Sequence, residues 1–512
     1  MSSIEQFTDG FWLIFDPLTV VLIFFGVIIG LIVGAMPGIG PVPGIAIVLP
    51  LTLQLEPWQA LPLLFAVYVG SMYGGAVAAI LLNIPGTPGA IASTFDGYPM
   101  SLRGEAKKAI DTSVISSAVG TVVAGVLMIL AVPFILRIIS YVGTPEYALF
   151  AILGLAIVPL ISQYSMSKAL MMGAFGVLIS TVGMPPNSSI PRYSLGTLRL
   201  TEGVTFVAVL LGLFAFAEMI KLVGYEGCLA SSNNGNSDGE KIKRQNLRGK
   251  NINDLVDRAN DIFIKNPITF VKSVVIAMFI GLIPAAGGAV SNILAYATEK
   301  STVKDNSRFG KGDIRGVISA ESANSGTIAS TFVPLLAFAI PGSPTSAVIL
   351  GGMLMHGLIP GPGMFQDSVQ YSYATFITII ISGVFLLFIG IYSAKYLSRI
   401  GYLKMHTMVP PVVILCMIGT YALALSIIDI IIAISFGLLG YLMIKYNYSV
   451  ITLILGLILG PIIESNIDRS LQLGDPSIFV AEPLRILLLL AIVLSLFAPV
   501  VSMFDNQRKN SE

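Results

Sequence analysis

Long apolar stretches, separated by short polar connections, make up most of the chain. A helix that crosses a bilayer needs about 20 mostly apolar residues. By that rule we predict spans at 18–35, 58–82, 110–136, 145–163, 167–183, 203–221, 267–283, 316–340, 372–395, 408–425, 427–444, 449–463 and 484–503. The pattern therefore predicts an all-α integral membrane protein with about 12–14 transmembrane helices.

Other apolar stretches are too short, or too rich in Pro and Gly, to cross as regular helices. They are 36–54, 84–95, 284–298 and 341–358. We predict that these are re-entrant or discontinuous segments. Backbone groups left unpaired at membrane depth are tolerated only where they line a cavity or lie buried in protein.

One polar segment, residues 224–264, interrupts the apolar pattern. Asn, Ser, Gly and Asp surround its basic residues, which include Lys241, Lys243, Arg244, Arg248 and Lys250. We predict that 224–264 is a cytoplasmic linker between two membrane repeats, residues 1–223 and residues 265–512.

The two predicted repeats resemble each other weakly but in the same order. Residues 34–40 match 281–287, and residues 84–88 match 340–344. Further along the chain, Pro145 with Gly154 corresponds to Pro410 with Gly419, and 175–178 corresponds to 436–439. Gly and Pro are common here, so the shared order, rather than any single match, indicates a duplication.

Loop charge predicts how the two repeats are oriented. Loop 51–62 carries no Lys or Arg, whereas the matching loop 299–315 carries several; loop 96–109 is basic, and its counterpart 354–371 is not. Basic loops stay in the cytoplasm, so matching loops lie on opposite sides of the membrane. We therefore predict two inverted-topology repeats, with the N-terminus outside and the linker inside.

Composition agrees with a membrane protein and excludes several other classes. Hydrophobic residues make up 55% of the 512 residues and charged residues 11%, against about 25% charged in soluble domains. Lys and Arg lie between apolar blocks, so nothing indicates a nucleic-acid partner. With only Cys228 and Cys416, neither a disulfide framework nor a transition-metal cluster is indicated. Phosphate-loop, G-x-S-x-G and H-E-x-x-H motifs are absent from the sequence, so we predict neither an ATPase nor another enzyme.

Hydroxyl and amide side chains gather around the two Ile-Pro-Gly motifs at 84–86 and 340–342. A helix that restarts after such a break presents free N–H groups and a positive dipole end, which suit a carboxylate. We predict substrate contacts at Asn83, Pro85, Gly86, Thr87, Ser93, Asn324, Ser325, Pro341, Gly342, Ser343, Thr345 and Ser346. The structural alternative for each hydroxyl is a bond to a neighbouring helix.

Carbonyl groups freed by the breaks could coordinate sodium, so we expect a transported coupling ion and no resident cofactor. The candidate ion-coupling residues are Gly38, Gly40, Gly287, Asn292 and Glu321. Acidic residues within spans are costly and mark function by default. For Glu218 beside Lys221 we expect a structural ion pair, and for Asp429 a role at the start of the helix after Ser426.

Several motifs together resemble the large membrane subunit of tripartite tricarboxylate transporters. They are 34–41, 73–75, 83–88, 309–312, 321–324, 340–343 and 356–362, with Gly212-Leu213-Phe214 and Glu218. The resemblance covers nearly the whole chain. The chain departs from the family pattern at Ser325, where relatives often have Asn, and at Pro284-Ala285-Ala286-Gly287, where many have Pro-Gly-x-Gly.

The resemblance implies a permease of the bacterial inner membrane that works with a smaller membrane subunit and a periplasmic solute-binding protein. It implies secondary transport of a small organic anion, such as citrate or another di- or tricarboxylate, driven by a sodium or proton gradient. Alternating access, by an elevator or a rocking motion, is the expected mechanism. The rival hypotheses are a passive channel, an intramembrane enzyme acting on lipid, and a scaffold subunit that translocates nothing.

Overall fold

The structure is a computed structural model that describes residues 3–36, 39–139, 141–161, 165–185, 189–223, 252–284, 286–397 and 409–509. These ranges consist of helices and loops; the one β-type pairing in them is an isolated bridge between Gly183 and Arg192. The prediction of an all-α membrane protein is therefore confirmed.

The helices follow the predicted apolar stretches. In the first predicted repeat they are α1 (Ser3–Ile14), α2 (Pro17–Gly34), α3 (Pro41–Val48), α4 (Pro57–Leu82), α5 (Ile91–Leu102), α6 (Ala106–Ile139), α7 (Thr144–Ile161), α8 (Met166–Ser180), α9 (Leu198–Thr201), α10 (Phe206–Leu210) and α11 (Ala217–Val223). In the second they are α13 (Ile252–Asn260), α14 (Pro267–Gly281), α15 (Gly287–Thr302), α16 (Ile314–Ser330), α17 (Phe332–Phe338), α18 (Pro344–Met355), α19 (Pro362–Asp367), α20 (Val369–Leu397), α21 (Val409–Ala424), α22 (Ile427–Lys445), α23 (Val450–Leu473) and α24 (Pro483–Lys509).

Within the described residues, seven helices are long and apolar enough to cross a membrane. An eighth span results if the pair Asn253–Lys265 and Pro267–Gly281, bent by 78°, is one broken helix. Shorter apolar helices of 10–17 residues occur at Pro41–Gln54, Thr144–Pro159, Met166–Ser180, Pro344–Met355, Val409–Ala422 and Pro483–Phe497. The total of about 12–14 transmembrane helices, the division into repeats and their inverted orientation stay predictions, and most of the expected linker lies outside the described residues.

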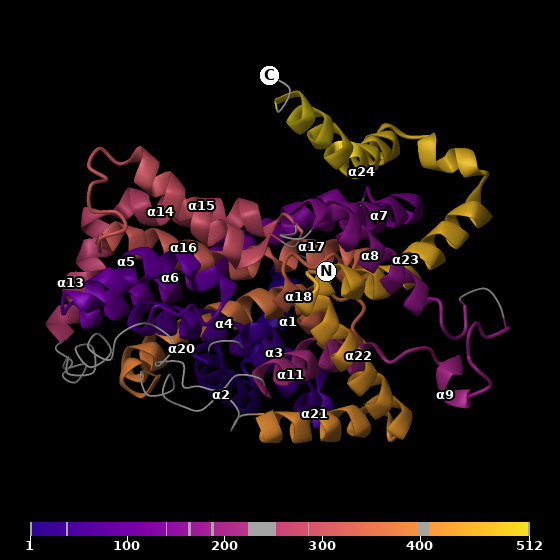
Figure 1. Cartoon of the computed structure of the whole chain (residues 1–512), viewed down its shortest axis with the longest axis horizontal. Helices are drawn as coiled ribbons and strands as arrows, with labels where there is room; N and C mark the ends of the chain where they lie inside the picture. The colour runs from indigo at the N-terminus through magenta and orange to yellow at the C-terminus, as the bar shows by residue number, and fades with distance from the viewer. Residues whose placement is uncertain are drawn as a thin grey trace.

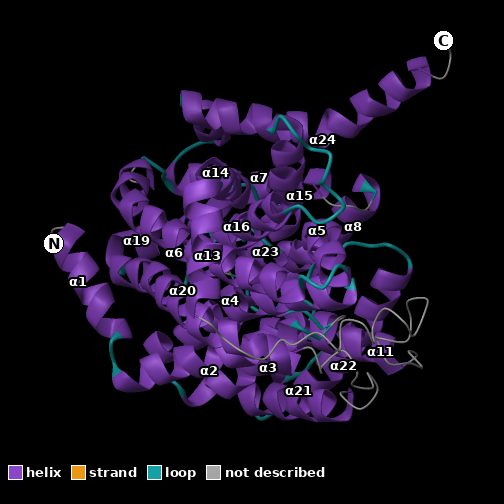
Figure 2. Cartoon of the chain, turned by 90° about the vertical axis from the view of Figure 1, so that its left-hand side faces the viewer, coloured by secondary structure: helices purple, strands orange, loops and turns teal. Residues whose placement is uncertain are grey.

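Helices from the two predicted repeats interleave rather than form separate bodies. α5 and α6 lie beside α14, α15 and α16 on the left of Figure 1, and α6 packs along α16 while α4 packs against α20. In Figure 2 the N-terminal α1 lies on the left flank of the bundle, and the last part of α24 extends away from it. α4 lies at the centre of the bundle, as shown by its most apolar 18 residues, which are wholly buried inside the protein.

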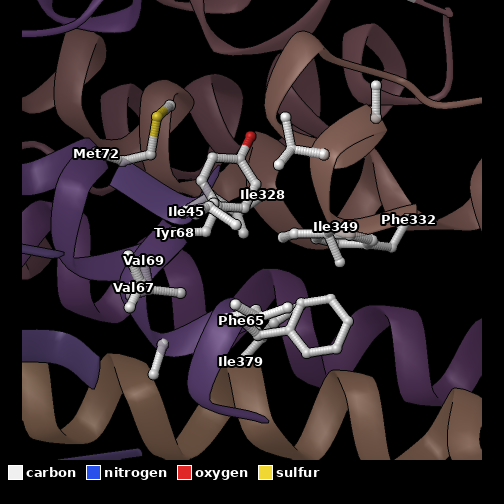
Figure 3. Packing of buried hydrophobic residues seen from close by; sticks show 14 of the residues in the cluster. Ile45, Phe65, Val67, Tyr68, Val69, Met72, Ile328, Phe332, Ile349 and Ile379 are labelled. Atoms are coloured by element: carbon white, nitrogen blue, oxygen red, sulfur yellow. The ribbon is translucent and has the colours of Figure 1, made fainter. Parts of the chain in front are cut away.

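Aromatic packing joins α4 to α17 in the core. The rings of Phe65 and Phe332 meet edge to face at 4.8 Å between centroids, and Tyr68 approaches the same Phe332 ring at 6.1 Å. Figure 3 shows these side chains with Met72 and Ile349 around them. Edge-to-face pairs at this spacing are favourable beyond the area that they bury, so this cluster fixes one half of the chain against the other.

Close backbone contact between α2 and α4 gives the first testable prediction. A methyl group at Gly70 would collide with the Val27 carbonyl oxygen and lie 3.0 Å from the Leu31 nitrogen. Gly70→Val should therefore lower the stability by about 1–3 kcal/mol through overpacking, measured as the thermal unfolding midpoint of detergent-purified protein. Gly363→Val on α19 is the matched control, because nothing lies within 4 Å of its side-chain position. Equal midpoints for the two variants would contradict the packing described.

Candidate functional site

The two Pro-Gly segments have the same backbone design. α4 is capped by Asn83 (φ 57°, ψ 27°) and α17 by Ala339 (φ 55°, ψ 24°), both left-handed. A left-handed residue ends a helix, and the following Pro prevents its continuation. Thr87 and Ser343 then adopt extended conformations before the chain turns helical again at Pro88–Ala90 and at α18.

The glycine of each motif contacts the end of an equivalent long helix. A methyl group at Gly86 would collide with the carbonyl oxygen of Gly34, the last residue of α2. A methyl group at Gly342 would lie 2.8 Å from the carbonyl oxygen of Gly281, the last residue of α14. The motifs matched in the sequence therefore occupy matching places in their own halves.

Side chains at the start of α18 already bind backbone N–H groups there. The Ser346 backbone N–H donates to Ser343 Oγ at 3.1 Å, and the Ser343 N–H donates to Ser346 Oγ at 2.9 Å, which forms a capping box. Tyr68 Oη lies 3.3 Å from Ser343 Oγ. Thr345 is buried beside them. This helix end can therefore shape a site, but part of its donor capacity is already used.

The segment after the first motif meets α15 at Asn324 of α16, and the second motif lies beside the start of α15. A methyl group at Gly89, just after the first motif, would collide with Asn324 Oδ1. A methyl group at Gly288 of α15 would lie 2.7 Å from the same oxygen. At the neighbouring Gly287 (φ 51°), a methyl group would lie 3.1 Å from Ser343 Cβ of the second motif. Segments far apart in sequence thus meet at one buried amide.

Unpartnered polar atoms mark this meeting point. Asn324 is fully buried, and in the described part of the chain neither its oxygen nor its nitrogen has a hydrogen-bond partner. The same holds for Thr87 Oγ1 and Ser325 Oγ. A buried polar group without a partner costs about 1–3 kcal/mol, and such groups are rare unless they serve a ligand, an ion or water. These atoms can bind a polar solute.

The other predicted contacts have different surroundings. Asn83 is exposed at its helix end, and Pro85 is half-buried. A methyl group at Gly40 would lie 3.4 Å from the Gly86 carbonyl oxygen, so the first motif lies beside the start of α3. Pro341 is buried with Gly342 in the second motif. Gly38 lies outside the described residues.

Glu321 and Asn292 tie α5 to α16. Glu321, fully buried, accepts hydrogen bonds from Ser93 Oγ of α5 and, at 2.8 Å, from Ser117 Oγ of α6. Asn292 accepts from the Ala92 backbone N–H at 2.8 Å and donates to the Ala320 carbonyl at 3.1 Å. Both amide atoms of Asn292 thus have protein partners, in contrast to Asn324.

Asp96 is a polar centre that the sequence reasoning missed. Its Oδ1 accepts from the backbone N–H groups of Gly310, Gly312 and Asp313 at 2.7–2.9 Å, and Tyr296 Oη donates to Oδ2 at 2.8 Å. Burial raises the pKa of Asp96, while these hydrogen bonds act to lower it. The glycines at 310 and 312 could have suggested a loop that binds an anion, but not which carboxylate fills it.

Glu218 and Asp429, the other two acidic residues singled out in the sequence, are held in ion pairs. Glu218 pairs with Lys221 at 2.9 Å, as expected. Ser426 accepts the N–H of Ile428 at the start of α22, and Asp429 instead pairs with Arg199 at 3.1 Å. Neither carboxylate points to transport chemistry.

A family model described as "Tripartite tricarboxylate transporter TctA family" matches residues 20–455. The chain belongs to this family. An uncharacterised 52.8 kDa protein in the TAR-I ttuC′ 3′ region of Agrobacterium vitis is 30% identical over 96% of this chain and 94% of its own length. A second protein, in the TAR-II ttuC′ 3′ region of the same organism, is 28% identical over 44% of this chain and 96% of its own length. No solved structure matches the chain.

Membership in the TctA family identifies the chain as a component of a tricarboxylate transporter and a multi-pass membrane protein. A TctA-family chain is part of a tripartite system and is placed among transporters rather than enzymes. The motifs that resemble the family include both Pro-Gly segments and the stretch from Glu321 to Asn324, which are the parts that meet in the core.

Proposed function

We propose that this chain is the permease subunit of a secondary transporter that imports an organic anion, a di- or tricarboxylate such as citrate. It works in the inner membrane with a small membrane subunit and a periplasmic solute-binding protein. A sodium or proton gradient drives uptake by alternating access. The family supports the transport role, and Asn324, buried with both amide atoms unpartnered in the described chain, supports the position of the site.

The chemistry around Asn324 suits a carboxylate. The amide nitrogen and the hydroxyl of Thr87 can donate to a carboxylate oxygen without a fixed positive charge. Neutral donors hold an anion less tightly than Arg or Lys would. A permease benefits from this, because conduction needs binding that is weak enough for the solute to leave.

Uptake of labelled carboxylates into proteoliposomes tests the proposed function. The large subunit, the small subunit and the solute-binding protein would be present, with citrate and other di- and tricarboxylates as the panel. We expect saturable uptake that needs the binding protein and an inward sodium or proton gradient. Flux that does not saturate and ignores both gradients would indicate a passive channel instead. No uptake of any carboxylate by folded protein would contradict the proposal.

A further inference from the structure

Glu321 differs from the other deeply buried glutamates in having no cationic partner. Glu146 pairs with Arg485 at 2.5 Å, and Glu299 pairs with Lys272 at 2.5 Å. Within the described residues, Glu321 has no Lys, Arg or His within ion-pair distance. The hydrogen bonds that it accepts come from hydroxyl groups. A buried carboxylate without a cation is costly, and the cost is removed when the group binds a positive ion or a proton.

The surroundings of Glu321 favour a proton over a metal cation. Ser93, Ser117 and Glu321 all lie inside regular helices, where backbone carbonyls are already used in helical hydrogen bonds. A hard cation prefers a shell of several oxygen ligands, and the freed carbonyls of this chain belong to the Pro-Gly breaks instead. A proton needs only one carboxylate oxygen.

Unpartnered hydroxyl groups line the helices next to Glu321. In the part of the chain that the structure describes, Tyr73 Oη, Ser113 Oγ and Ser116 Oγ are buried and have no hydrogen-bond partner. Ser113 and Ser117 are four residues apart on α6 and therefore share a face. The Tyr73 hydroxyl interacts electrostatically with both Glu321 and Asp111. Hydroxyl groups can both donate and accept, so those of Tyr73 and Ser113 can pass a proton to the carboxylate.

We propose that Glu321 is the proton-binding group of this permease, with the hydroxyls of Tyr73 and Ser113 as its access route. A proton enters from one side of the membrane, binds a carboxylate oxygen of Glu321, and leaves to the other side. This inference rests on the proposed function, because it names the coupling ion of the same transporter.

Glu321 and Asn324 lie close together on α16, which links the proton site to the solute site. Asn324 follows Glu321 by three residues, so both side chains lie on one helical face. The Glu321 carboxylate accepts hydrogen bonds from Ser93 of α5 and from Ser117 of α6. A carboxylic acid has an O–H to donate and less capacity to accept. Protonation therefore changes the bond to α5, which continues directly from Gly89 beside Asn324.

Most other ionisable groups on the helices around α16 have partners of their own. The pairs are Asp96 with Tyr296, Lys107 with Asp254, Glu299 with Lys272, Arg315 with Asp313, and Arg103 with the carbonyls of Lys311 and Gly312. Tyr68 of α4 bonds Ser343, and the ionisable groups among the described side chains of α20 are Tyr371, Tyr373, Tyr392 and Tyr396. Tyr73 of α4 interacts electrostatically with Glu321 and with Asp111 of α6.

Infrared titration of the purified full-length chain in lipid tests the proton site without any substrate. We expect the carbonyl-stretch band of a buried carboxylic acid to grow as the pH falls, and Glu321→Gln to lack it. Glu464→Gln on α23 is the matched control, because Glu464 pairs with Arg192 of the loop before α9 and its substitution should leave the band unchanged. Glu321→Asp, with a shifted band, covers the case in which the Gln variant does not fold. A wild type without a titrating band, or a Gln variant that keeps it, would overturn the proposal.

Citrate accumulation driven by a pH gradient in proteoliposomes of the whole complex separates this inference from the proposed function. We expect Glu321→Gln to lose accumulation by about tenfold or more, as a typical coupling energy implies. Wild-type uptake that is driven by sodium and does not respond to the pH gradient would overturn the inference. The proposed transport function would still stand. A titrating Glu321 band in a protein that transports no carboxylate would refute the proposed function alone.

Discussion

Asn324→Leu should abolish most carboxylate uptake while the protein stays folded. Leucine has nearly the same size, but it removes both unpartnered amide atoms, of which the oxygen faces Gly89 and Gly288. Since these atoms have no partner in the described chain, their loss breaks no internal hydrogen bond. Losing one bond to a charged ligand, at about 1.5–3 kcal/mol, should reduce uptake about 10- to 100-fold.

The matched control for this prediction is Asn466→Leu on α23. Its amide nitrogen donates to the Ile462 carbonyl at 2.7 Å, one helical turn away, so it has a structural partner that Asn324 lacks. We expect this control to transport normally and to lose some thermal stability. Normal uptake by Asn324→Leu would place the solute elsewhere, and unfolding of Asn324→Leu would show that the amide is structural.

Asp96→Ala should produce the largest loss of stability. The substitution leaves three backbone N–H groups of loop 310–313 and the Tyr296 hydroxyl without their acceptor. The Asp313 N–H and the Tyr296 hydroxyl are buried donors, which cost about 1–3 kcal/mol each when unpaired, and the Gly310 and Gly312 N–H groups are partly buried. The total should therefore be about 3 kcal/mol or more. Hydrogen exchange of residues 309–313, with the thermal unfolding midpoint, measures the effect.

Two further variants separate geometry from charge at this position. Asp96→Asn keeps an Oδ1 acceptor for the three N–H groups, and its new amide can donate to Tyr296 Oη, so it should retain most of the stability. Asp305→Ala in the same loop removes only exposed local bonds to Ser307 and should change little. Equal destabilisation by Asp96→Ala and Asp305→Ala would contradict the described loop.

Local sequence pattern predicted the helices well, because a membrane span can be recognised from about 20 consecutive apolar residues. Each predicted span corresponds to a helix or a helical pair, and Ile-Pro-Gly correctly indicated the breaks after Asn83 and Ala339. Asn324 was among the hydroxyl and amide side chains predicted as substrate contacts. These signals are all contained in short windows of sequence.

Contacts between distant segments could not be predicted in the same way. No residue near Asn292 in the sequence indicates that its amide is hydrogen-bonded to the backbone of Ala92 and Ala320. Likewise, no residue near Asn83 indicates that its side chain is exposed. The acceptor role of Asp96 likewise depends on a loop in the other half of the chain. Such pairings arise from how helices pack, which periodicity along one helix does not determine.

Protection of an engineered thiol tests most directly whether the Pro-Gly segments form the solute site. Cys228 and Cys416 are the only cysteines; both would be replaced, and Thr87→Cys would be labelled with a thiol reagent with and without the transported carboxylate. Gly363→Cys on α19 serves as the control. A site at Asn324 and Thr87 predicts slower labelling at position 87 when the solute is present, and unchanged labelling at position 363. Equal labelling of Thr87→Cys with and without the solute would contradict the account.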